Sequence, residues 1–188
     1  MKRFVIICFL IPFMLSAAPS ASFLETTIKS LVVVSYVEGE ETRQCTGFVV
    51  SASKGEVLTA AHCVPHNTTD PVEVNSELST VIRRSDSLAL LQVVPTLRPP
   101  LDIRKNAVDI GEKIYAFGFA WDHLVVVQRN VAAFFGPDFG VDGPLAPGMS
   151  GGPMVDTQGK VVGVNQATNE VLGLACGPQE IRTFLEGK

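Results

Sequence analysis

Hydrophobic and polar residues alternate along most of the chain in short runs rather than at helical spacing. The runs are rich in Val, Ile, Phe and Leu, and clusters of Gly, Pro, Asn or Ser separate them. Such runs predict strands, at residues 31–37, 46–50, 56–59, 79–83, 88–93, 113–119, 125–131, 153–155, 161–166 and 172–176. Helical patterns are confined to residues 22–29 and 178–185. Many short strands at this spacing predict an all-β fold, either a sandwich or a pair of barrels.

The first 21 residues differ from the rest of the chain. Two basic residues precede an apolar stretch at 4–15, and small residues follow from Ser16. This order is typical of a secretory signal peptide, and we place its cleavage after Ser20. A membrane span needs about 20 apolar residues. This run is shorter and contains Pro12, so we expect no stable membrane anchor and a mature protein outside the cytoplasm, in the periplasm or extracellular.

Charge and cysteine content exclude several classes of function. The formal net charge is −4 and there is no basic run, so we expect no binding to nucleic acid. Export makes disulfides possible, and beyond the signal peptide the cysteines are Cys45, Cys63 and Cys176. No CxxC pair and no His/Cys cluster has the spacing of a zinc site. We therefore expect no metal and no cofactor, and the oligomeric state stays open.

Three short segments carry the candidate chemistry: TAAHC at 59–63, DSLALL at 86–91 and GMSGGP at 148–153. They offer a hydroxyl nucleophile in Ser150, an imidazole base in His62 and a carboxylate in Asp86. Serine is a poor nucleophile at neutral pH, so a histidine must take its proton and a third group must orient that histidine. The glycines around Ser150 allow a tight turn that aims the N–H groups of Gly148 and Ser150 at a developing oxyanion.

The order of these residues separates two folds. Gly148-x-Ser150-x-Gly152 also fits the nucleophile elbow of α/β-hydrolases, in which the base histidine follows the serine. Here the last histidine is His123, before Ser150. The order His62, Asp86, Ser150 is instead that of chymotrypsin, and the chain lacks the alternating helices of an α/β-hydrolase.

On these motifs the chain resembles serine peptidases of the trypsin/chymotrypsin family, in the style of the Deg-type (high-temperature-requirement) proteases. The resemblance covers nearly all of residues 31–185 and includes CTGFVV at 45–50, VDIGEK at 108–113, GKVVGVN at 159–165 and LGLA at 172–175. It implies two packed antiparallel six-stranded β-barrels with the active site between them and a short C-terminal helix. We therefore divide the chain into a signal peptide (1–20), an N-terminal barrel (21–97), a linker (98–107) and a C-terminal barrel with a terminal helix (108–188).

The resemblance also implies specific contacts. Cys45 and Cys63 would form a disulfide, which leaves Cys176 as a buried, unpaired thiol. Asn165, Gln166 and Ala167 would pair with the extended backbone of a protein or peptide substrate. Pro144 stands six residues before Ser150, where trypsin-like members that cut after Arg or Lys have an acid. A small or apolar residue before the scissile bond is therefore expected.

The sequence departs from the family pattern at the acid. The pattern runs Asp, apolar, Ala, Leu, Leu, which puts Ser87 rather than Asp86 in the acid's position. A one-residue shift in a regular strand turns a side chain to the opposite face, although a bulge or loop start would bring Asp86 back to His62. We assign the third role to Asp86, with Ser87, Asp102 and Asp109 as alternatives.

Two further departures concern activation and length. Met149 stands where many relatives have an acid that pairs with a freed N-terminus, so activity is not expected to depend on propeptide cleavage. The chain ends at Lys188, and we expect no PDZ domain. Two functions follow: a secreted serine endopeptidase, or a protease-fold binding or regulatory protein with little turnover, suggested by the shifted acid. A minor alternative is other acyl transfer, such as an esterase.

Overall fold

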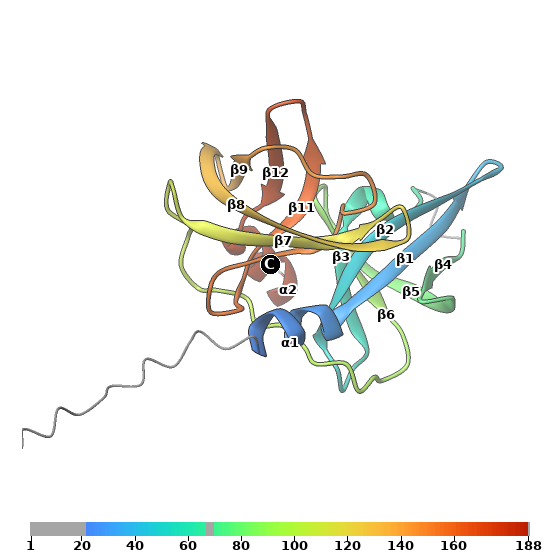
Figure 1. The fold of residues 1–188 in the computed structure, drawn as a ribbon. Helices are drawn as coiled ribbons and strands as arrows, with labels where there is room; N and C mark the ends of the chain where they lie inside the picture. The colour runs from blue at the N-terminus through green and yellow to red at the C-terminus, as the bar shows by residue number, and fades with distance from the viewer. Residues whose placement is uncertain (1–21, 67–69, 188) are drawn as a thin grey trace, which may run out of the picture.

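Twelve strands form two closed antiparallel β-barrels in residues 22–66 and 70–187, the part of the chain that this computed structural model describes. The first barrel contains β1 (Leu31–Glu38), β2 (Glu41–Ser51), β3 (Glu56–Ala60), β4 (Val72–Val74), β5 (Glu77–Arg84) and β6 (Leu88–Gln92), in the order β1-β2-β3-β6-β5-β4. Figure 1 shows this barrel beside the second one. The predicted signal peptide lies outside the described residues.

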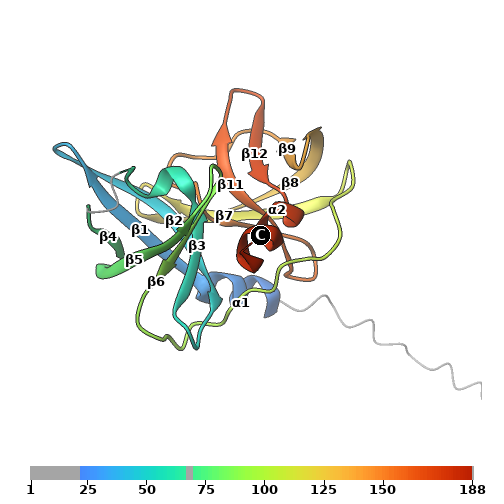
Figure 2. The same cartoon turned by 180° about the vertical axis from the view of Figure 1, so that it is seen from behind.

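The second barrel contains β7 (Lys113–Ala120), β8 (His123–Phe135), β9 (Asp138–Asp142), β10 (Pro153–Val155), β11 (Val161–Thr168) and β12 (Leu172–Cys176), in the order β10-β11-β12-β9-β8-β7. Three helical segments accompany the barrels: α1 (Ser22–Ser30), the 3₁₀ turn η1 (Ala61–Cys63) and α2 (Pro178–Glu186). Figure 2, from behind, shows α2 at the second barrel. The predicted all-β class with two six-stranded barrels and a C-terminal helix is confirmed.

All strands and helices predicted from the hydrophobic pattern are present, and two further strands, β4 and β9, were not predicted. β4 has only three residues, with Glu73 exposed between two buried valines. β9 contains Gly140 and lies between β8 and β12. A Cβ on Gly140 would come within 3.1 Å of the Phe135 ring, so the glycine serves the packing of a neighbouring strand. Neither strand has a local pattern long enough to be recognised in the sequence.

One of the three hydrophobic clusters in the described residues extends across both barrels. A single cluster contains Leu31, Phe48, Leu58, Leu88 and Leu90 from the first barrel together with Phe117, Val155, Val161, Val164 and Cys176 from the second and Ile181 and Phe184 from α2. Helix α2 begins at Gly177 and Pro178 and ends at Gly187, whose φ of +76° is the left-handed conformation that glycine adopts without strain. Arg83 of β5 donates to the carbonyl of Phe184 and lies over its ring. The relative position of the barrels is therefore set by buried side chains from both.

The segment between β6 and β7 follows the surface of both barrels. The backbone N–H of Leu101 donates to Val49 of β2, and two backbone hydrogen bonds link residues 102–104 to Val161 of β11. Arg104 forms hydrogen-bonded ion pairs with Glu112 and contacts Asp156. This connection holds the barrels to each other as well as joining them along the chain.

Candidate active site

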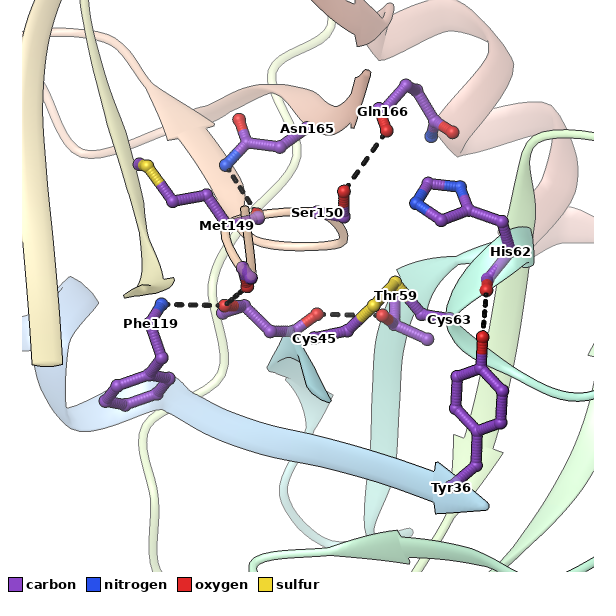
Figure 3. Close-up of a disulfide and its surroundings, with 12 residues drawn as sticks. Tyr36, Cys45, Thr59, His62, Cys63, Phe119, Met149, Ser150, Asn165 and Gln166 are labelled. Carbon is purple, nitrogen blue, oxygen red and sulfur yellow. Dashed lines mark hydrogen bonds between the residues drawn. A yellow bond between two sulfur atoms is a disulfide. The ribbon is translucent and has the colours of Figure 1, made fainter. Parts of the chain in front are cut away.

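The predicted nucleophile and base meet where the two barrels join. His62 lies in η1, directly after β3 of the first barrel, and Ser150 lies in the loop between β9 and β10 of the second. The N–H of Thr46 in β2 donates to the carbonyl of Ser150 across the junction, at 2.8 Å. Figure 3 shows Ser150, His62 and Gln166 around the same space, with the Cys45–Cys63 disulfide beside them.

Glycines shape the loop that carries Ser150. Gly148 has a φ of +92° and Gly151 a φ of +80°, values that side chains disfavour. A Cβ on Gly151 would lie 2.1 Å from the Thr59 hydroxyl and 2.2 Å from the Thr46 carbonyl, and a Cβ on Gly148 would lie 2.4 Å from the Phe119 carbonyl. The glycines therefore let the loop approach the backbone of both barrels, which fixes Ser150 at the junction.

Thr46 anchors this loop from the first barrel. Its buried hydroxyl donates to the carbonyl of Gly148 and accepts the N–H of Phe119, both at 2.8 Å. Its own carbonyl accepts the hydroxyl of Thr59 at 2.8 Å. Sequence reasoning quoted Thr46 only as part of a motif and missed this role. Thr46 follows four exposed polar residues and Cys45 at the start of β2, so no local pattern distinguished it as a buried hydroxyl.

Asn165 anchors the loop from the second barrel. Its buried Nδ2 donates to the carbonyls of Phe117 and Met149, both at 2.9 Å. Its backbone N–H donates to Gly152 and its carbonyl accepts from Gly151. The expectation that Asn165 pairs with substrate therefore needs correction. Its side chain is buried and both of its backbone groups already have partners within the chain.

Two backbone N–H groups at the serine have no hydrogen-bond partner among the described residues. Those of Gly148 and Ser150 donate no hydrogen bond to any described residue. Met149 between them turns its side chain into the core of the second barrel and is fully buried. The turn thus leaves two donors available on the loop that presents the Ser150 hydroxyl, as an oxyanion hole requires.

His62 is held by its backbone and by the disulfide. Its carbonyl accepts the Tyr36 hydroxyl at 3.1 Å, and Cys63 is bonded to Cys45 with 5.8 Å between the Cα atoms. The predicted disulfide is therefore present, and Cys176 is buried and unpaired as expected. The His62 side chain keeps an exposed surface, but partial burial lowers its pKa below the ordinary value of 6.5.

The hydroxyl of Ser150 and the ring of His62 are not bonded to each other in this structure. The Ser150 hydroxyl donates to the carbonyl of Gln166 at 3.2 Å (Figure 3). The ring of His62 makes no hydrogen bond to any residue in the described part of the chain. Rotation of the serine side chain is the movement that would direct its hydroxyl toward the imidazole.

The carboxylate predicted to orient His62 forms no hydrogen bond with it in this structure. Asp86 is exposed and forms no hydrogen bond or ion pair with the described residues. Asp86 lies in the turn before β6, whose pairing with β3 is regular and begins at Leu88. The hydroxyl of Ser85 accepts the N–H groups of Ser87 and Leu88 and fixes the turn.

Ser87, not Asp86, contacts the other site residues. Its carbonyl accepts the N–H of Ala61 at 2.9 Å and the Nε2 of Gln166 at 3.0 Å. Gln166 was predicted as a substrate residue, and sequence reasoning missed that it spans from the nucleophile to the segment before β6. Its signal was a long polar side chain in the strand that follows the serine.

The region predicted to select substrate is partly filled by side chains and has the Arg129 guanidinium beside it. The carbonyl of Pro144 accepts from Arg129, and Leu145 is almost completely buried. A Cβ on Gly173 of β12 would lie 2.8 Å from Cγ of Leu145, so this leucine packs directly on the glycine. Asp142 is exposed, and both of its carboxylate oxygens accept hydrogen bonds from Asn130.

Potential metal ligands gather in two places within the described residues. Cys45, His62 and Cys63 form one group, but its two sulfur atoms are joined in the disulfide. Asp138, Cys176 and Glu180 form the other, where burial raises the pKa of the Cys176 thiol and opposes the thiolate that a metal needs.

Comparisons with known proteins identify similar sequences and folds. The family of the trypsin-like peptidase domain matches residues 45–164. A probable periplasmic serine endoprotease DegP-like from Ectopseudomonas mendocina is 33% identical over 136 residues, 64% of this chain and 28% of the relative. The corresponding protein from Pseudomonas fluorescens is 32% identical over 137 residues, again 64% and 28%. The chain thus spans little more than a quarter of the length of these relatives.

Solved structures share the fold at lower identity. The serine endoprotease from Yersinia pestis has a TM-score of 0.75 at 22% identity, over 87% of this chain and 64% of that one. The active form of the Rv3671c protease from M. tuberculosis has a TM-score of 0.76 at 20% identity, over 98% and 93%. In the described part of this chain, no helix is both long and apolar enough to cross a membrane.

Proposed function

The chain belongs to the trypsin-like peptidase family, and from this premise we propose that it is a serine endopeptidase that hydrolyses peptide bonds through an acyl-enzyme on Ser150. The observation that carries the proposal is the loop around Ser150. It presents a hydroxyl at the barrel junction with two unpartnered N–H groups beside it, and an imidazole extends from the facing barrel.

In the proposed reaction His62 is the general base. Because burial lowers its pKa, the ring is neutral at neutral pH and has a free nitrogen for a proton. The Ser150 hydroxyl leaves the Gln166 carbonyl, gives its proton to His62, and its oxygen attacks the scissile carbonyl carbon. The N–H groups of Gly148 and Ser150 stabilise the oxyanion. His62 then protonates the leaving amine, and water releases the acyl group by the same steps in reverse order.

The proposal rests on Ser150 and His62 and does not require Asp86. The sequence nominates Asp86 for the third role, but its exposed carboxylate forms no hydrogen bond to His62 in this structure. Losing the acid from a known triad costs roughly four orders of magnitude in turnover. The proposed function therefore implies either that a group other than Asp86 orients His62 or that turnover is slow.

The proposed substrate is an extended peptide beside β11, contacted by Gln166 and Ala167. We further propose a small or apolar residue before the scissile bond. Three features support this choice: Pro144 supplies no charge, Leu145 packs on Gly173, and the carboxylate of Asp142 is exposed and engaged by Asn130. A buried cationic side chain would lack the partner that burial of a charge requires.

We propose that the protein acts outside the cytoplasm. The predicted signal peptide and the names of the periplasmic relatives support this location. The Cys45–Cys63 disulfide supports it as well, because such bonds persist in oxidising compartments.

A second candidate is a protease-fold binding or regulatory protein with little turnover. The observation that favours it is the lack of any carboxylate hydrogen-bonded to His62 among the described residues. It predicts that peptide binds at the barrel junction without reaction at Ser150, whereas the endopeptidase predicts covalent chemistry there.

Intact-mass analysis after incubation with a fluorophosphonate probe distinguishes the two functions. The folded, oxidised protein should gain one adduct, and Ser150→Ala should gain none. Ser53→Ala, which removes an exposed hydroxyl in the turn between β2 and β3, should label like the wild type. Folded protein that acquires no adduct would favour the binding protein.

A further inference from the structure

We propose that the side-chain amide of Gln166 positions His62, in the role that a carboxylate has in a serine–histidine–acid triad. The inference rests on the proposed function, since it concerns the base of that reaction. It makes Gln166 a positioning residue that acts through His62, whose ring has no carboxylate as a hydrogen-bond partner among the described residues.

The local structure of β11 aims Gln166 at the junction. Pairing with β12 shifts between Asn165 and Ala167, so Gln166 is the extra residue of a bulge. A bulge re-aims a side chain out of the regular alternation of a strand. Asn165, the residue before it, is buried and hydrogen-bonded at both its backbone and its side chain. The residue before the bulge is therefore held in place by hydrogen bonds to the nucleophile loop.

Two hydrogen bonds place Gln166 between the nucleophile and the base. Its carbonyl accepts the Ser150 hydroxyl at 3.2 Å, and its Nε2 donates to the Ser87 carbonyl at 3.0 Å. That same carbonyl accepts the N–H of Ala61, the residue before His62. The amide is thus tied to the backbone that neighbours the imidazole. Figure 3 shows the Gln166 side chain and the His62 ring on the same side of Ser150.

The residue at the acid's position makes room for this arrangement. Ser87 stands where the sequence pattern expects an acid, and its side chain is one of the smallest polar ones. Gln166 enters from the other barrel with a side chain long enough to reach Ser87. The short Ser87 before β6 and the long Gln166 of β11 together place one amide group near the base.

The chemistry of the amide determines which of its atoms is left to accept a hydrogen bond from His62, a bond that is not formed in this structure. The Ser87 carbonyl only accepts, so the amide nitrogen must point toward it, and Oε1 is left as an acceptor. An acceptor at Nδ1–H of His62 selects the tautomer whose Nε2 is free to take the serine proton. A cysteine–histidine–asparagine site orients its histidine with a neutral amide in the same way. No proton passes to Gln166.

The electrostatics of His62 agree with a neutral partner. Burial is what lowers the pKa of this histidine, and no nearby carboxylate offsets it. An adjacent carboxylate would favour the imidazolium and raise that pKa. A neutral acceptor orients the ring without this effect, so the base remains unprotonated to a lower pH than in a site with an acid.

The test compares Gln166→Met, Gln166→Glu and the wild type by NMR of the imidazole nitrogens and by steady-state kinetics. Gln166→Met keeps the length but removes the acceptor. The Nδ1–H tautomer of His62 should lose population, and kcat should fall about 10- to 100-fold with KM within about 2-fold. Gln166→Glu should raise the pKa of His62 by about one unit or more and move the pH profile with it.

A matched control separates orientation from packing. Gln128→Met makes the same chemical change at an exposed position of β8, and it should leave the tautomer and kcat unchanged. The protein has only three histidines, His62, His66 and His123, so His62→Gln assigns the signal directly.

The proposal is overturned if Gln166→Met leaves the His62 tautomer and pKa as in the wild type. It is also overturned if Asp86→Asn changes both while Gln166→Met changes neither, which would return the third role to Asp86. Fluorophosphonate labelling of the wild type reports separately on the proposed function. The NMR result judges Gln166 even if the wild type does not label.

Discussion

Replacing Thr46 with valine tests whether the first barrel holds the nucleophile loop. The change keeps the branched shape of a fully buried side chain and removes only its hydroxyl. That hydroxyl makes two hydrogen bonds of 2.8 Å, to the Gly148 carbonyl and from the Phe119 N–H. Valine therefore leaves one buried acceptor and one buried donor without their partner.

The expected cost follows from these two groups. A buried polar group left unpaired costs about 1–3 kcal/mol, and the loop gains nothing in exchange. We expect Thr46→Val to lower the free energy of unfolding by about 2–4 kcal/mol. Because the Gly148 carbonyl belongs to the loop that presents Ser150, labelling by a fluorophosphonate should also slow.

Urea unfolding followed by tryptophan fluorescence measures this change, with Thr46→Ser and Thr42→Val as controls. Thr46→Ser keeps the hydroxyl and should recover most of the stability and labelling. Thr42→Val makes the same substitution at an exposed position of the same strand and should change stability by less than about 0.5 kcal/mol. If Thr46→Val unfolds within about 0.5 kcal/mol of the wild type, the loop is not anchored in this way.

Three further predictions follow from the site. Gly151→Ala should abolish labelling and strongly lower the free energy of unfolding, because its Cβ would lie 2.1 Å from the Thr59 hydroxyl. The control Gly136→Ala, at a positive φ with no atom near its Cβ, should lower that free energy by only about 1 kcal/mol, and equal losses in the two variants would contradict the steric argument. Removing the Cys45–Cys63 disulfide, which spans 18 residues, should cost about 3 kcal/mol in urea unfolding, and an unchanged midpoint after reduction would oppose this. Because burial lowers the pKa of His62, kcat/KM should rise with pH through an apparent pKa below 6.5, and a kinetic pKa above 6.5 would indicate a nearby acid. The unfolded chain also binds more protons than the folded one near this pH, so the free energy of unfolding of the wild type should fall, relative to that of His62→Gln, as the pH is lowered.

The sequence was sufficient for the fold where strands are long and apolar. The runs at 113–119 and 161–166 could be recognised because their own apolar side chains are enough to indicate a buried strand, without knowledge of the strands that pair with them. β9 could not, because Gly140 makes it a poor strand locally and its place depends on β8 and β12. Motif spacing was similarly sufficient for the chemistry: TAAHC and GMSGGP indicated His62 and Ser150, and the two elements do meet at the barrel junction.

Contacts between the barrels were beyond the sequence. Thr46, Asn165 and Gln166 are polar residues in strands, and nothing local tells which of them faces the core, the loop or the solvent. The bulge at Gln166 illustrates the reason: a single shift in pairing with β12 decides where the side chain points. The position of Asp86 depends likewise on the turn that the Ser85 hydroxyl stabilises.

The core shared by the two barrels has a consequence for when the site forms. Leu31 and Phe184 belong to the same buried cluster although they are far apart in the sequence. Contacts of such long range slow folding, and the shared cluster is incomplete until the segment with Ile181 and Phe184 has been synthesised. The junction that brings His62 and Ser150 together is therefore completed late in folding, and neither barrel can form the site alone.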